Sequence, residues 1–132
     1  MTARGMKGPA DFDEWPAVLE CGYGPFRAVV QYIVDGDTFR ALLSVGLNSY
    51  EFRTIRILDI DTPEINRPES KEAGLAAKAR LTELMPPGEP VLIRTKPDPD
   101  SFGRYLGAVR TEAEFDIGAV LLREGFAMPY VR

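Results

Sequence analysis

Residues 29–43 read VVQYIVDGDTFRALL, and this stretch decides how the fold begins. Its first part, 29–34, is almost entirely β-branched or aromatic, which is typical of a strand. The Asp35-Gly36 pair that follows is a strong hairpin signal, because both residues tolerate the positive backbone dihedrals of a tight turn. The stretch from Thr38 to Leu43 returns to an apolar strand pattern. The sequence therefore predicts a β-hairpin here.

The rest of the chain adds three strands and two helices. A turn near Gly46 to Ser49 leads into a long predicted strand, Tyr50–Ile60. A helix is expected over Ser70–Met85, with Ser70 as its cap, and a short last helix begins after Asp116 and runs through Glu124. The stripe of the first helix comprises Ala73, Ala76, Ala77, Leu81 and Leu84, and the remaining strands are Pro90–Thr95 and Tyr105–Arg110.

This order of elements predicts a mainly β (α+β) fold. An antiparallel meander of five strands with an inserted helix and a short C-terminal helix suits a small closed barrel of the oligonucleotide-binding (OB-fold) type. Residues 1–25 are expected to be an N-terminal extension, since they hold several Gly and Pro residues, and 26–132 form the barrel domain. Phe12, Trp15 and Leu19 in the extension are expected to pack on the barrel.

Composition excludes several kinds of chemistry. Cys21 is the only cysteine and the chain has no His, so an intrachain disulfide, a Cys/His zinc site and a His base are all excluded. No apolar run approaches the roughly 20 residues of a membrane span, and no export signal is visible. We therefore expect a monomer with no membrane partner, cytoplasmic as written, while export of a mature form stays open. The net charge of −4 means that any binding to a polyanion must rest on local basic groups and a metal ion.

Charged residues interrupt the long predicted strand. Taken alone, Asp35-Gly36-Asp37-Thr38 indicates a tight turn, and Asp61-Thr62-Pro63-Glu64 could simply end a strand. However, Arg56 and Asp59 lie within an otherwise apolar run, where charges are rarely buried unless they are paired or functional. Strict alternation would place Arg56 and Asp61 on opposite faces, so their convergence requires a bend or bulge between them.

Four segments together resemble the successive motifs of the staphylococcal (thermonuclease-type) nuclease family. They are Asp35-Gly36-Asp37-Thr38, the run from Arg56 to Glu64, Phe102-Gly103-Arg104, and the run from Leu121 to Ala127. The resemblance extends from about residue 26 to residue 130, with the motifs in order. Four agreeing motifs are far more specific than any single short one.

The resemblance implies a calcium site and a general base. Asp37 and Asp61 match carboxylate ligands for Ca²⁺, and the backbone carbonyl of Thr62 matches a further ligand. Hard oxygen donors of this kind are what Ca²⁺ prefers. Glu64 matches the residue that positions and deprotonates the attacking water.

The resemblance also implies how the substrate is held. Arg56 and Arg104 match two arginines that bracket the scissile phosphate and stabilise the charge of the pentacovalent transition state. Tyr130 matches an aromatic residue that supports stacking of a base or sugar.

Two functions remain open at this point. The first is a calcium-dependent nuclease that hydrolyses phosphodiester bonds of DNA, RNA or both, because the set of acidic and basic residues is complete. The second is a non-catalytic module of the same fold that binds nucleic acid or protein.

Overall fold

The structure, a computed structural model, describes residues 23–130. The predicted packing of Phe12, Trp15 and Leu19 on the barrel lies outside the described residues. The first strand, β1, already begins at Tyr23. Within the described range, no helix is long and apolar enough to cross a membrane.

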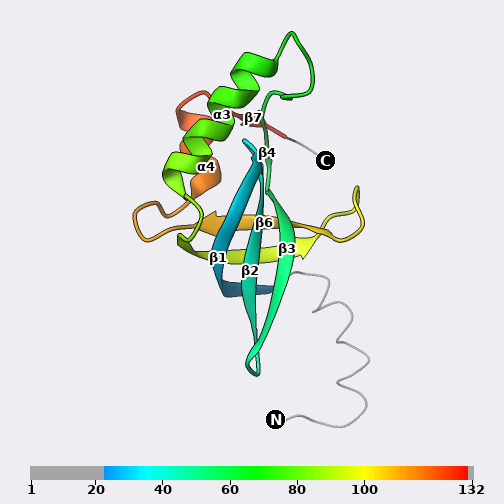
Figure 1. Cartoon of the computed structure of the whole chain (residues 1–132), viewed down its shortest axis with the longest axis vertical. Coiled ribbons are helices and arrows are strands. Elements are labelled where there is room, and N and C mark those ends of the chain that lie inside the picture. Colours follow the sequence, from blue (N-terminus) through cyan, green and yellow to red (C-terminus); the bar gives the residue numbers. More distant parts are fainter. Residues whose placement is uncertain (1–22, 131–132) are drawn as a thin grey trace.

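Five strands close into a barrel in the order β1-β2-β3-β6-β5 (Figure 1), which confirms the predicted barrel. One expectation was wrong: the strands are not all antiparallel. β3 and β6 run parallel, with Thr54 beside Arg104, because the inserted helix leads into β5, which runs antiparallel to both β1 and β6, and β6 then closes the barrel beside β3. The bounds are β1 Tyr23–Asp35, β2 Thr38–Gly46, β3 Ser49–Ile57, β5 Pro90–Pro97 and β6 Arg104–Arg110.

Two helices lie together at one end of the barrel, and the β2–β3 hairpin projects from the other end (Figure 1). They are α3, Lys71–Leu84, and α4, Ile117–Arg123. Leu81 of α3 and Leu121 of α4 are fully buried and join the barrel core. Removing such side chains from water is the main favourable contribution to packing the helices on the barrel.

The side-chain cap predicted for α4 is present, whereas the one predicted for α3 is not. Asp116 caps α4 as predicted, because its carboxylate accepts a hydrogen bond from the Ala119 amide at 3.1 Å. Ser70 precedes α3 but does not cap it through its side chain. Its hydroxyl donates instead to the carbonyl oxygen of Glu64 at 2.6 Å, which ties the start of the helix to the preceding loop.

The buried face of α3 is narrower than the predicted stripe. Ala73 and Ala76 are exposed, whereas Gly74, Ala77 and Leu81 are buried. A Cβ atom added at Gly36, in the β1–β2 turn, would lie 2.6 Å from the Cβ of Ala77. The helix therefore packs directly on the turn that carries Asp37, and this contact leaves room only for glycine at position 36.

The predicted long strand Tyr50–Ile60 is broken at Leu58 and Asp59. β3 ends at Ile57, and a short strand β4, Ile60–Asp61, pairs with β7, Met128–Pro129. Asp59 has a φ of 66°, in the left-handed region that lets the chain turn sharply. The bend that the convergence of Arg56 and Asp61 required is therefore present.

Candidate active site

Asp37 is the anchor of a polar cluster beside the β1–β2 turn. It is buried, and its carboxylate accepts three hydrogen bonds from groups on three different segments. The Thr38 hydroxyl donates to Oδ1 at 2.9 Å, while the Arg56 guanidinium and the Thr62 amide donate to Oδ2 at 2.9 and 3.2 Å. These donors satisfy a carboxylate that would otherwise be costly to bury.

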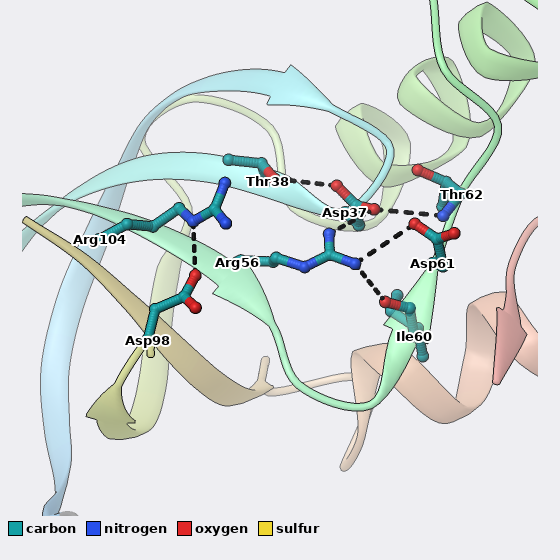
Figure 2. Close-up of polar contacts among 8 residues, drawn as sticks. All are labelled: Asp37, Thr38, Arg56, Ile60, Asp61, Thr62, Asp98 and Arg104. Carbon is teal, nitrogen blue, oxygen red and sulfur yellow. Dashed lines mark hydrogen bonds and ion pairs between the residues drawn. The ribbon is translucent and has the colours of Figure 1, made fainter. Parts of the chain in front are cut away.

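Arg56 connects the two sides of the bend (Figure 2). Its Nη1 bonds Asp37, and its Nη2 donates both to the carbonyl oxygen of Ile60 at 3.0 Å and to Oδ1 of Asp61 at 3.3 Å. Its side chain is 11% exposed, whereas that of Asp61 is 55% exposed. The two predicted carboxylate ligands therefore both contact the Arg56 guanidinium, Asp37 at Nη1 and Asp61 at Nη2.

The flat face of the Arg56 guanidinium also contacts an aromatic ring. The Tyr130 ring lies 5.1 Å from the Arg56 Cζ atom, which is a cation–π contact. The Tyr130 amide donates to the carbonyl oxygen of Asp59 at 3.0 Å, so the C-terminal segment is fixed to the bend itself. The structure therefore places Tyr130 against Arg56, and its predicted role in stacking a base stays a prediction.

Electrostatic effects at the cluster have clear causes. Burial acts to lower the pKa of Arg56, but the charges and hydrogen bonds of Asp37 and Asp61 outweigh it and raise this pKa further above its ordinary value. Burial raises the pKa of Asp35, and repulsion from Asp37 adds to that rise, with a smaller contribution from Glu64. Attraction to Lys78 and, less strongly, to Arg56 offsets part of this rise in the pKa of Asp35.

Glu64 and Arg104 do not contact this cluster directly. The Glu64 carboxylate is 63% exposed and pairs with Arg67 at 2.8 Å. No hydrogen bond links Glu64 to Asp37, Arg56 or Asp61, and its charge makes only a small contribution to the raised pKa of Asp35. Arg104 starts β6, beside Thr54 of β3, and Figure 2 shows it pairing with Asp98 rather than with the Asp37 group.

Asp98 is a residue that sequence reasoning missed. Its side chain is 0% exposed, and its Oδ2 accepts a hydrogen bond from Nε of Arg104 at 2.7 Å. The bond uses Nε, and within residues 23–130 the terminal nitrogens of Arg104 make no hydrogen bond. The usable signal was a carboxylate six residues before the arginine of a motif, in the connection between two strands expected to be neighbours.

The donors present suit a hard cation such as Ca²⁺, although carboxylates alone do not complete a site. Asp37 and Asp61 each bring a carboxylate oxygen to the Arg56 guanidinium, and carboxylate oxygens are ligands that Ca²⁺ prefers. In the described part of the chain, no group of three or more Asp, Glu, His or Cys side chains could hold a metal. Further oxygen ligands would have to come from backbone carbonyls, water and a phosphate.

The fold and this cluster define a small barrel of the oligonucleotide-binding type with a charged site beside its first turn. A family model described as "Staphylococcal nuclease homologue" matches residues 54–132. The chain belongs to the staphylococcal nuclease family.

One similar protein is named as an endonuclease. The chain is similar to the Endonuclease YhcR of Bacillus subtilis (strain 168), with 30% identity over 115 residues. The aligned region covers 81% of this chain but only 9% of that much longer protein. The likeness therefore concerns only a small part of that protein.

Proposed function

We propose that this chain is a calcium-dependent nuclease that hydrolyses phosphodiester bonds in DNA, RNA or both. The observation that carries the proposal is the convergence of Asp37 and Asp61 on the Arg56 guanidinium, which gathers acidic and basic groups from both sides of the bend. Membership of a nuclease family and the endonuclease name of the relative support it.

Arg56 and Arg104 would bind the phosphate. Each guanidinium can donate two parallel hydrogen bonds to phosphate oxygens and stays charged as negative charge builds on them. Asp98 holds Arg104 through Nε, which leaves the terminal nitrogens to reach the substrate. Arg56 would exchange its contact with the exposed Asp61 for a phosphate oxygen while keeping Asp37.

Glu64 would act as the general base. In this role its carboxylate leaves Arg67 and accepts a proton from the attacking water as the new bond to phosphorus forms. The bond between phosphorus and the 5′ oxygen breaks, that oxygen leaves with a proton from solvent, and the other product ends in a 3′-phosphate. Glu64 is exposed, so this movement disrupts no packing.

Asp37, Asp61 and the Thr62 carbonyl would hold the calcium ion. When bound, the ion supplies positive charge to a phosphate oxygen and acidifies nearby water. The Thr62 amide already donates to Asp37, so the backbone at this position is fixed against the carboxylate.

The first test is metal-dependent cleavage by the full chain. Labelled single-stranded DNA and RNA oligonucleotides are incubated with calcium or with an excess of chelator, and the product ends are identified by mass spectrometry. We expect cleavage only with calcium, leaving 3′-phosphate ends. Equal cleavage in chelator would contradict the metal site, and binding without cleavage in calcium would support the non-catalytic alternative.

A further inference from the structure

One end of the barrel is hollow in the part of the chain that the structure describes. Helices α3 and α4 lie together at one end, and the β2–β3 hairpin projects from the other (Figure 1). Toward the hairpin end lies a hollow of about 500 Å³, which we call the barrel mouth. Its wall is mainly apolar, and its lining residues include Phe26, Leu43, Val45, Ile55, Thr95 and Tyr105.

The mouth opens onto the hydrophobic core. Leu43 and Ile55 belong to the core, and Phe26 and Tyr105 pack against it. Val45 continues the inward side of β2 beyond Leu43 and is 38% exposed. Covering this wall would remove apolar surface from water, which is the main favourable contribution to packing. The mouth therefore suits an apolar segment.

Thr95 adds a polar group to this apolar wall. It is 7% exposed, and within residues 23–130 its hydroxyl makes no side-chain hydrogen bond. A buried hydroxyl without a partner is unfavourable. A segment that fills the mouth would therefore stabilise the barrel further if it brought a donor, and the indole N–H of tryptophan is such a donor.

The N-terminal segment enters the barrel at the mouth. Tyr23, the first residue of β1, pairs with Thr95 of β5. Among the residues before it, Phe12, Trp15 and Leu19 have the three- and four-residue spacing that is typical of one face of a helix. Leu19 precedes Tyr23 by four residues, so even an extended chain keeps it within roughly 14 Å of Tyr23.

We propose that Trp15 and Leu19 dock in the barrel mouth of the same chain and close this end of the barrel. The Trp15 ring would pack against Val45, its indole N–H would donate to the Thr95 hydroxyl, and Leu19 would lie nearer the start of β1. The segment would then cover this end as α3 and α4 cover the other. The inference is independent of the proposed function, because it concerns the end of the barrel away from the candidate active site.

A second hollow, on the outer side of the barrel, is the alternative place for the segment. It measures about 540 Å³, and its lining residues include Arg27, Val29 and Leu92. The mouth is favoured because it adjoins the point where the segment enters β1 and because it holds the buried Thr95 hydroxyl.

Tryptophan fluorescence of the full chain tests the docking. Trp15 is the only tryptophan of the sequence, so the signal reports on this residue alone. We expect its emission to be blue-shifted relative to the chain unfolded in urea, and its quenching by acrylamide to be severalfold weaker. Emission and quenching equal to those of the unfolded chain would overturn the proposal.

Two matched variants distinguish the mouth from the outer hollow. Val45 and Val29 are 38% and 43% exposed, and each lines one of the two. Val45→Asp places a charge in the mouth, so it should shift the emission to the red and raise the quenching severalfold. Val29→Asp should change neither, and circular dichroism shows whether both variants fold. The opposite pair of results would place Trp15 in the outer hollow and refute the mouth.

A measurement on the wild type needs no variant. We expect nuclear Overhauser contacts between the Trp15 indole and the methyl groups of Val45 and Ile55. Contacts with Val29 in their place would overturn the proposal. Protection from acrylamide that disappears on dilution would also overturn it, because the segment would then come from a second copy of the chain.

Melting of the full chain tests whether the docking stabilises the fold. Trp15→Ala should lower the melting temperature by about 5 °C or more, because a large buried apolar side chain is lost. Phe115 is the matched control, since this aromatic residue is 78% exposed, and Phe115→Ala should melt as the wild type does. Equal melting of Trp15→Ala and the wild type would contradict docking of Trp15.

Discussion

Arg56→Ala should cost both stability and activity, because Arg56 has two separate roles. The substitution leaves Asp37, whose side chain is 8% exposed, as a buried carboxylate without its cationic partner. Removing one partner of a buried ion pair typically costs about 3 kcal/mol, so melting should fall by roughly 10 °C or more. The cleavage rate, measured below the melting range, should fall by at least about a hundredfold through loss of a guanidinium at the phosphate.

Arg53 is the matched control for Arg56. It lies on the same strand, is 43% exposed and pairs with Glu51 at the surface, where an ion pair contributes about 1 kcal/mol or less. Arg53→Ala should therefore melt and cleave nearly as the wild type does. Arg56→Lys should recover part of the stability but little of the rate, since an ammonium keeps the charge and loses the forked geometry. An Arg56→Ala variant with wild-type melting and cleavage would show that the cluster supports neither the fold nor catalysis.

Glu64→Gln should affect the rate alone. The side chain is 63% exposed, so its loss of charge should leave melting unchanged. Loss of a general base typically lowers the rate by about 10² to 10⁴, and we expect a fall within that range in calcium. Single-turnover cleavage of a labelled oligonucleotide, measured beside binding in chelator, separates this effect from weaker substrate binding.

Two controls make the result specific to the base. Glu69 is exposed in the same connecting segment, and Glu69→Gln removes an equal charge without touching the site. Arg67→Ala removes the observed partner of Glu64 and should leave the rate within a few-fold of the wild type. If Arg67→Ala reduces the rate as strongly as Glu64→Gln, the ion pair matters and the assignment of Glu64 as base is wrong.

Much of the fold follows from local sequence signals. The hairpin at Asp35-Gly36, the α4 cap at Asp116 and the five strands were predictable because turn chemistry and alternation act over a few residues. The parallel pairing of β3 with β6 was not, since it depends on how a barrel closes between strands far apart in the sequence. Ser70 does not cap α3 through its side chain, because its hydroxyl is directed toward the carbonyl oxygen of Glu64, a contact that local sequence rules do not indicate.

The sequence predicted which residues form most of the candidate site, but not which of them contact one another. Alternation alone showed that Arg56 and Asp61 need a bend to meet, and the left-handed Asp59 provides it. No local rule indicates that Arg56 would lie between both carboxylates. The ion pair between Asp98 and Arg104 could not be predicted either. A carboxylate in a turn usually bonds only nearby amides, whereas Asp98 also reaches the side chain of Arg104 at the start of the next strand.

The most direct test of the central claim is a calcium titration of cleavage by the wild type and by Asp61→Asn. Asp61 is the exposed member of the converging pair, so its replacement should leave the fold intact and weaken only the cation site. We expect the calcium concentration for half-maximal cleavage to rise about tenfold or more in the variant, in keeping with the loss of one charged ligand. Superimposable titration curves for the two proteins would contradict the account, because calcium would then act somewhere other than between Asp37 and Asp61.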